Sequence, residues 1–445
     1  LGRTFLAVTV YLTLTQLSRS GKAYYPLMLL LILTLGLGVY NSSAARTIDL
    51  NSTERTLYKY GTDVVVQTIW EGFSNTLPKA QQPVGGGSQP GEKPGENPGG
   101  GNPTPPPVGM PEQMLYVEPP FEIFRNLPGV EHAARVLLAR GDAAASGKSL
   151  GKGMVMGIDN TEFSDVAWFR EDLFPAHPRE YLNLLGYYEQ GVLIPSSFAE
   201  DHLLKVGDII TIALQQQAVE FVIAGVLPYW PSQYPDEVPF FITNLEYIYD
   251  QVPIIPYEVW LKMEDGAKTT PLINDLLKKD IELVSVKDVR IDLAAQAKHP
   301  SRGGVFGILS LGFLVSVMIS LIGYVLYWFF NLSSRIVQFG VLRAMGLSRK
   351  QLTGMLLLEQ GFTAGLSIAL GIGIGKLVSY LFLPFLQTSE NVKQQVPPFR
   401  VVFEAKDTYQ LYGVVVFMML TGAVLLFIHI RKLRVHQAVK LGEER

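Results

Sequence analysis

Four long apolar stretches constrain how this chain of 445 residues can fold. They cover residues 24–40, 304–330, 355–386 and 411–430. A helix needs about 20 mostly apolar residues to cross a bilayer, and it pairs its own backbone polar groups there. Hydrophobic residues make up 48% of the chain, which is high for a soluble enzyme. The sequence therefore predicts an α-helical membrane protein with four transmembrane helices.

The polar region between the first and second apolar stretches is large enough to fold by itself. It contains short runs rich in Val, Ile and aromatic residues, typical of strands, and amphipathic segments typical of helices. Strands are predicted at residues 136–140, 154–159, 192–195, 209–214, 219–227, 240–243 and 257–263, and helices at residues 161–173, 178–185, 197–203 and 270–279. Because strands and helices do not alternate regularly, we expect an inserted α+β domain.

The distribution of positive charge predicts the topology, because Lys and Arg accumulate on the cytoplasmic side of a membrane. Arg19 and Lys22 precede the first apolar stretch, residues 335–350 are basic, and the C-terminal tail carries Arg431 and Lys432. We therefore expect both termini to be cytoplasmic and the α+β domain to be extracytoplasmic. The protein would be a multi-pass protein of the cell (plasma) membrane.

These patterns divide the chain into five parts. They are an amphipathic interfacial segment at residues 1–22, a first transmembrane helix at 23–43, an extracytoplasmic α+β domain with stalks at 44–300, a membrane domain with three helices at 301–430 and a cytoplasmic tail at 431–445. Residues 1–22 suit equally well the end of an earlier membrane helix. Residues 78–111 are dominated by Pro and Gly, so we expect a disordered insert that serves as a linker.

A basic amphipathic segment leads directly into the third apolar stretch. Its two neighbouring helical rows are Ile336, Phe339 and Arg343, and Val337, Val341 and Met345. Gly346 suits the position just after a helix end. Ser348 and Gln351 then have the spacing of a capping box, which predicts that the next helix starts there.

The helix predicted after Ser348 carries two further features. Small residues recur every four positions at Gly361, Gly365, Ala369 and Gly373, and such a stripe allows another membrane helix to approach closely. Glu359 lies in the apolar stretch, where a charged group is costly and is a candidate functional residue. It is either a solvated or arginine-paired interfacial group or a contact that couples this helix to the basic segment. Arg343 is one candidate partner.

The order of these motifs resembles the FtsX/MacB-type permease domain of ABC transporters. The similar segments are residues 335–338, GVLRAMGLSRKQL, LLLEQGF and the Gly-rich helix, and in the outer domain residues 155–169, 192–212 and 221–232. In that family a short cytoplasmic helix docks on the ATPase subunit. The resemblance implies ATPase-docking residues Arg335, Phe339, Arg343, Met345, Arg349 and Lys350, with Glu359 as a coupling candidate. Because family permeases work in pairs, it also implies a second permease copy, or a second half if this is the C-terminal half of a longer permease.

Motifs for catalysis are missing from the sequence. The chain has no Cys, and its six His residues do not show the spacing of zinc ligands. GDAAASGKS at residues 141–149 has five residues between its glycines where a phosphate-binding loop needs four, so we interpret it as a flexible loop. We expect no catalytic residue, metal or cofactor, and ATPase activity would belong to a separate subunit. A net charge of −3 gives no reason to expect nucleic-acid binding.

The resemblance implies the permease subunit of an ABC transporter. ATP hydrolysis by a partner would move the extracytoplasmic domain to export or extract a peptide, lipid, lipoprotein or drug. The expected partners are a cytoplasmic ABC ATPase, a second permease copy, the lipid bilayer and an extracytoplasmic protein or cargo. Three alternatives stay open: a non-transporting regulator of a cell-wall enzyme, a ligand-binding membrane sensor, and a membrane-anchored enzyme with its site in residues 115–289.

Overall fold

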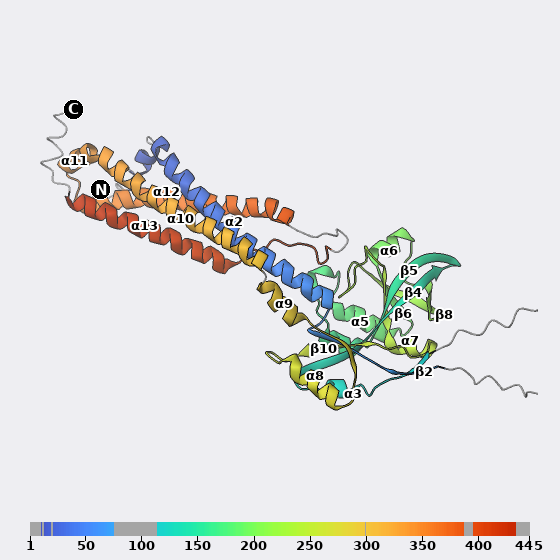
Figure 1. Ribbon diagram of the computed structural model, residues 1–445. Helices are drawn as coiled ribbons and strands as arrows, with labels where there is room; N and C mark the ends of the chain where they lie inside the picture. Colours follow the sequence, from blue (N-terminus) through green and yellow to red (C-terminus); the bar gives the residue numbers. More distant parts are fainter. Residues whose placement is uncertain are drawn as a thin grey trace, which may run out of the picture. The chain divides into compact units, whose positions relative to one another are not determined.

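The computed structural model describes residue 10 and residues 13–18, 21–74, 114–298, 300–386 and 395–432 (Figure 1). The chain forms two compact units. We call Leu1–Thr56 with Ile291–Arg445 the helical unit, and Leu57–Arg290 the sheet unit. The predicted Pro/Gly insert lies outside the described residues, as do most of the predicted interfacial segment and of the C-terminal tail.

Four long helices build the helical unit and lie side by side in Figure 1. They are α2 (Gly21–Tyr60), α10 (Pro300–Ser334), α12 (Arg349–Phe382) and α13 (Ala405–Lys432), and the short α11 (Ile336–Ala344) connects α10 to α12, while the 3-10 turn η2 (Leu383–Leu386) follows α12. All four long helices are long and apolar enough to cross a membrane. The prediction of four spans is therefore confirmed, and α2 continues without a break well beyond its predicted transmembrane part.

The core of the helical unit combines leucines with large aromatic residues. Its buried members are Leu27, Leu31, Tyr324, Trp328, Leu332, Phe339, Leu352, Leu356 and Met418. The outward sides of the same helices are also apolar; Ile308 and Phe330, for example, are 73% and 64% exposed. A helix that is apolar all round is typical of a membrane span, since its outer face meets lipid.

The sheet unit is built on a nine-stranded mixed sheet with the order β11-β1-β10-β4-β5-β9-β6-β8-β7. Its strands are β1 (Val64–Thr68), β4 (Val130–Ala145), β5 (Lys148–Ile158), β6 (Gly191–Pro195), β7 (Ile209–Leu214), β8 (Gln217–Leu227), β9 (Phe240–Asn244), β10 (Glu258–Met263) and β11 (Leu283–Asp288). Neighbours are antiparallel except β5–β9 and β6–β8. β7 also pairs with the far end of β4, so six of the strands close into a ring.

Short helices pack on the sheet, and β2 (Glu71–Ser74) pairs with β3 (Met114–Val117) in a separate two-stranded ribbon. The helices of the sheet unit are α3 (Glu122–Arg125), α4 (Asn160–Val166), α5 (Pro178–Tyr187), α6 (Ser196–Asp201), α7 (Leu245–Gln251) and α8 (Thr269–Lys278), with the 3-10 turn η1 (Glu171–Leu173). Most of α9 (Val289–Ala297) belongs to the helical unit. This mixture confirms the predicted α+β class.

Two apolar cores lie in the sheet unit, because side chains of a strand point alternately to its two faces. β8 shows this alternation of buried and partly exposed positions along most of its length, whereas β6 is buried throughout. In one core the rings of Phe163 and Trp230 stack with centroids 5.8 Å apart and an interplanar angle of 5°. Such aromatic pairs add to the free energy gained from burying apolar area.

The glycine-rich stretch at residues 141–149 is a hairpin rather than a flexible loop. Residues 136–145 of β4 pair with residues 148–158 of β5. Ser146 and Gly147 connect the two strands and have φ angles of 50° and 76°. Two consecutive residues with positive φ are typical of the tight turn that joins antiparallel strands. The prediction of flexibility was wrong because the strand pairing supplies order that the local composition does not indicate.

Asp288 fastens the end of β11 to the start of α8, and its stability contribution is expected to depend on pH. Arg290 donates from Nε to Oδ1 at 3.1 Å and from Nη2 to Oδ2 at 3.0 Å, and the Thr269 hydroxyl also donates to this carboxylate. Burial alone would raise the pKa of Asp288, but the hydrogen bonds from Arg290 and Thr269 and the charge of Arg290 lower it below its ordinary value.

Since the folded pKa is depressed, the contribution is complete above the ordinary aspartate pKa of about 3.9 and is lost as the pH falls through the lower folded value. Hydrogen exchange, corrected for intrinsic rates, measures the free energy of opening of β11 and α8. We expect this free energy to fall by about 1–2 kcal/mol between pH 5 and low pH. Asp288→Asn should remove this pH dependence, while the exposed control Asp265→Asn should keep it. An equal pH dependence in Asp288→Asn would contradict the assignment.

Candidate functional site

A buried ion pair lies inside the helical unit at Glu359 of α12. Glu359 is 0% exposed, and Arg335 donates from Nη1 to its Oε1 at 3.0 Å and to its Oε2 at 3.4 Å. The Tyr24 hydroxyl of α2 donates to Oε1 and accepts from Arg335 Nη2 at 2.8 Å. Every charged group of this cluster is therefore paired, as a charge removed from water requires.

Arg335 reaches Glu359 because it is the one residue between α10 and α11. α10 ends at Ser334, and Arg335 has φ −109° and ψ 10°, outside the helical region. Its guanidinium also lies over the Tyr24 ring, 5.6 Å from the centroid. Arg343, the partner suggested from the sequence, is in the last turn of α11 and makes no ion pair with Glu359. The partner of Glu359 is therefore Arg335 and not Arg343. The helix is interrupted at Arg335, between α10 and α11, and this interruption directs the Arg335 side chain inward.

Gln360 continues the same polar cluster toward the other two long helices. Its Nε2 donates to the Tyr324 hydroxyl of α10 and, at 3.0 Å, to the Met419 carbonyl of α13. Its Oε1 is buried without a hydrogen-bond partner among the described residues. Two consecutive residues of α12 thus contact all three other long helices. We call Tyr24, Tyr324, Arg335, Glu359 and Gln360 the polar cluster.

The remaining predicted docking residues, in α11, the turn after it and the start of α12, differ in burial. Phe339 is 3% exposed and packs in the core of the helical unit, whereas Met345 is 68% exposed. Arg343 is half-buried, Lys350 is exposed, and the side chain of Arg349 lies outside what the structure describes. Arg335 and Phe339 therefore anchor α11 from within.

The outward row of α11 consists of Val337, Val341 and Met345, which are 47%, 53% and 68% exposed. The turn that follows holds this row in place. Gly346 has φ 104°, and the Leu347 amide donates to the Leu342 carbonyl at 3.1 Å, a typical helix-ending arrangement. The predicted capping box is confirmed, because Ser348 and Gln351 exchange both hydrogen bonds.

The predicted small-residue stripe on α12 faces outward. A Cβ added at Gly361, Gly365 or Gly373 would have no atom within 4 Å, and Ala369 is exposed. No helix of the described part of the chain packs on it, so its role in packing stays a prediction that concerns another chain.

A different pair of glycines on α12 forms the close contact with α2. A Cβ added at Gly371 would lie 2.8 Å from Leu35 Cβ, and one at Gly375 would lie 2.8 Å from the Gly36 carbonyl oxygen and 2.7 Å from Val39 Cβ. The backbones of α2 and α12 meet there, as is common between membrane helices with small residues.

Side chains on one face of α2 also hold the segment that precedes α13. Asn51 Nδ2 donates to the Arg400 carbonyl at 2.8 Å, and the Arg400 amide donates to Asn51 Oδ1 at 3.0 Å. The Val402 amide donates to Thr47 Oγ1 at 3.1 Å, and Ser43 Oγ donates to the Val402 carbonyl at 3.0 Å. Residues 400–402 are therefore attached to α2 by four hydrogen bonds to side chains.

Residues 309–435 match the family model described as FtsX-like permease C-terminal. This match confirms the resemblance indicated by the membrane motifs. No curated protein matches the chain.

Among solved structures, the chain is similar to the periplasmic region of MacB from Actinobacillus actinomycetemcomitans, with 12% identity, a TM-score of 0.28, and coverage of 40% of this chain and 81% of that one. It is also similar to the extracellular domain of the noncanonic ABC-type transporter YknZ from Gram-positive bacteria, with 13% identity and a TM-score of 0.28. That match covers 37% of this chain and 87% of the YknZ domain.

Proposed function

We propose that this chain, which carries an FtsX-like permease C-terminal domain, is the permease subunit of an ABC transporter. A separate cytoplasmic ATPase subunit binds α11 and supplies the energy by hydrolysing ATP. The helical unit carries the resulting movement across the membrane, and the sheet unit acts on the cargo, which is a peptide, lipid, lipoprotein or drug. The basic residues near α11 support a cytoplasmic position for it.

The polar cluster carries this proposal. Arg335 lies at the start of α11 and is paired with Glu359 of α12 and Tyr24 of α2. A force applied to α11 therefore acts directly on two long helices through charge-assisted hydrogen bonds, which are the strongest kind in proteins. The low polarity around the cluster strengthens these bonds further.

α2 supports the proposed transmission because it is one unbroken helix, and β1 follows it in the chain after three residues. Tyr24 is near its first turn and Asn51 is 27 residues further on, about 40 Å along the axis at about 1.5 Å per residue. One helix thus carries the contact with Arg335 at one end and the contact with residues 400–402 at the other.

The outward stripe on α12 supports the further proposal that two permease copies work together. Gly361, Gly365, Ala369 and Gly373 present small side chains to the outside of the helical unit. Another membrane helix could approach such a surface closely.

Charge reversal on α11 tests the docking proposal. Met345→Glu places a negative charge in the outward row, and Arg343→Glu reverses the only basic residue within α11. We expect either variant to reduce co-purification of the ATPase at least about tenfold, since a charge placed at a central contact of an interface costs about 2 kcal/mol or more. The measurement is affinity purification from membranes followed by quantitative mass spectrometry.

Leu203→Glu is the matched control, because Leu203 is an exposed apolar residue of the sheet unit, 84% exposed. It should leave ATPase recovery unchanged. Docking at α11 would be contradicted if the Met345→Glu and Arg343→Glu proteins recovered a normal amount of ATPase. Size-exclusion chromatography would first show that both variant proteins are folded and not aggregated.

A further inference from the structure

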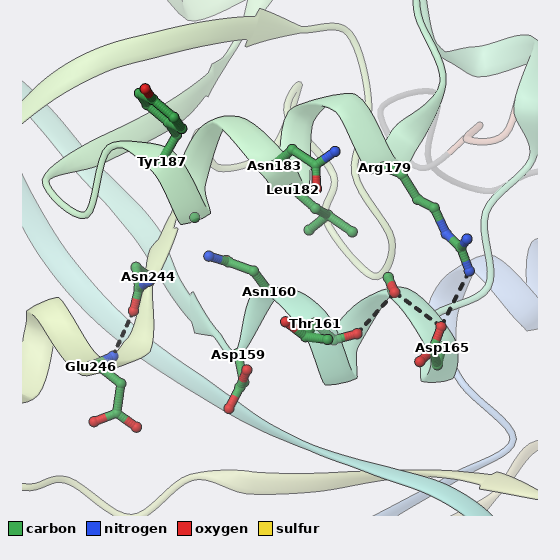
Figure 2. Close-up of a pocket in the computed structure, with 12 residues that line it drawn as sticks. Asp159, Asn160, Thr161, Asp165, Arg179, Leu182, Asn183, Tyr187, Asn244 and Glu246 are labelled. Atoms are coloured by element: carbon green, nitrogen blue, oxygen red, sulfur yellow. Dashed lines mark hydrogen bonds and ion pairs between the residues drawn. The ribbon is translucent and has the colours of Figure 1, made fainter.

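An open pocket of about 880 Å³ lies in the sheet unit between α4, α5 and the start of α7 (Figure 2). Its volume is within the range of about 300–1,000 Å³ found for sites of drug-sized ligands. It is lined by Asp159, Asn160, Thr161, Ser164, Asp165, Arg179, Leu182, Asn183, Gly186, Tyr187, Asn244 and Glu246. Nothing in the proposed movement of the helices uses these residues.

The charged groups around this pocket largely neutralise one another. Arg135 donates to Asp159 at 3.1 Å and to Glu246 at 2.6 Å. Arg179 donates to Asp165 at 3.3 Å. With three carboxylates and two guanidinium groups so paired, the pocket does not present the concentrated charge that attracts a phosphate or a metal ion.

The carboxamides of the pocket, in contrast, have unused hydrogen-bonding capacity. Asn160 Oδ1 is buried without a partner among the described residues. Figure 2 shows the Asn160 side chain directed toward the last turn of α5, where a Cβ added at Gly186 would lie 3.5 Å from Asn160 Nδ2. Since this oxygen is buried, a ligand would instead contact the amide nitrogen of Asn160 and the exposed side chain of Asn183, and both can donate to hydroxyl oxygens.

The rest of the lining favours a polyhydroxylated ligand over an apolar one. Leu182 is the one aliphatic side chain among the described lining residues and is 2% exposed, so the lining offers almost no aliphatic side chain to an acyl chain. Tyr187 is 83% exposed at the rim, where its ring can stack on the C–H face of a sugar. Carboxamides and carboxylates together both donate to and accept from hydroxyl groups.

We propose that this pocket binds a neutral oligosaccharide. The sugar hydroxyls pair with the amides of Asn160 and Asn183 and with the free carboxylate oxygens, and one ring stacks on Tyr187. This inference deepens the proposed function by giving the sheet unit a ligand class, and it rests on that function only for the role of the ligand as cargo or signal.

Calorimetric titration of the purified full-length protein in detergent, without an ATPase, tests the assignment. The probes are chitotetraose, cellotetraose and maltotetraose. We expect at least one to bind, and we expect Asn183→Ala and Tyr187→Ala to weaken binding about threefold to tenfold, as loss of single hydrogen bonds or stacking contacts does. Both side chains are exposed, so both variants should fold.

Gln190→Ala is the control, because Gln190 is an exposed carboxamide near the pocket but outside its lining. It should bind like the unaltered protein. The assignment is overturned if none of the three probes binds the folded protein, or if Asn183→Ala and Gln190→Ala bind equally well. It is also overturned if only a tetrapeptide such as tetralysine binds with dependence on Asn183 and Tyr187. None of these outcomes bears on ATPase docking, which is measured separately.

Discussion

Glu359→Gln is expected to destabilise the helical unit by about 3–5 kcal/mol, because it leaves the Arg335 guanidinium buried without a counter-charge. Glu359 is 0% exposed and the Arg335 side chain is 9% exposed, so water cannot supply the lost charge compensation. The amide oxygen of Gln can still accept from Tyr24 and Arg335, but it carries no charge. Thermal unfolding of the purified protein in detergent, followed by tryptophan fluorescence, measures the loss.

The double variant Arg335→Met with Glu359→Leu separates the charge from the packing. Replacing a buried ion pair by apolar residues of similar size is often neutral or stabilising, but here the buried Tyr24 hydroxyl loses both of its partners. This variant should therefore lose about 1–3 kcal/mol, less than Glu359→Gln. It would also lose the link from α11 to α12 and α2. We therefore expect a folded permease that binds its ATPase but no longer couples ATP hydrolysis to transport.

Full coupling in the double variant would show that the polar cluster serves stability alone. A stable Glu359→Gln protein would contradict the buried ion pair itself. Tyr24→Phe gives a smaller step, since it removes one hydroxyl and should cost about 1 kcal/mol.

Gly375→Ala is expected to destabilise the helical unit by about 1–3 kcal/mol through steric overlap between α2 and α12. The added methyl group would lie 2.8 Å from the Gly36 carbonyl oxygen and 2.7 Å from Val39 Cβ. A backbone oxygen cannot move aside as a flexible side chain can, so the two helices must separate. The change should be visible as a lower unfolding temperature in detergent.

Gly354→Ala is the matched control on the same helix, because Gly354 lies outside the small-residue stripe. Its added methyl group would have no atom within 4 Å, so the higher helix propensity of Ala should leave stability unchanged or raise it by up to about 1 kcal/mol. If both variants lost equal stability, the contact between α2 and α12 at Gly375 would be refuted.

The regular elements of this fold were largely predictable because their signals are local. The length of the four apolar stretches was enough to predict the four long helices. Short runs rich in β-branched residues predicted strands, and residues 219–227, for example, correspond to strand β8. The turn after α11 was also predictable, since Gly346 and the pair Ser348 and Gln351 act through neighbouring backbone groups.

The contacts of the site were less predictable because they join residues far apart in sequence. Glu359 was a candidate from its apolar surroundings alone, but Tyr24 is 335 positions away and contributes nothing to any local pattern. Gln360 was missed, although an amide within an apolar stretch is itself a signal for a cross-helix hydrogen bond. The stripe of small residues was visible, whereas its outward orientation depends on how α12 packs against α2.

The long β4 strand shows the same limit in the sheet unit. Only residues 136–140 were predicted, whereas the strand extends over Val130–Ala145. Its polar and Ala-rich ends pair with β10, β5 and β7, and these partners supply the backbone hydrogen bonds. Strand formation there depends on tertiary pairing more than on intrinsic propensity.

Site-specific photo-crosslinking tests the central claim most directly. A photoreactive phenylalanine analogue at Met345, the most exposed position of the outward row of α11, should crosslink in native membranes to a protein that carries an ABC ATPase domain. The same analogue at Phe385, which is 84% exposed in η2 beyond the far end of α12, should not. Recovery of an ATPase from position 345 alone is the predicted result. Absence of an ATPase at position 345, or equal recovery from both positions, would contradict the proposal that this chain is an ABC permease driven through α11.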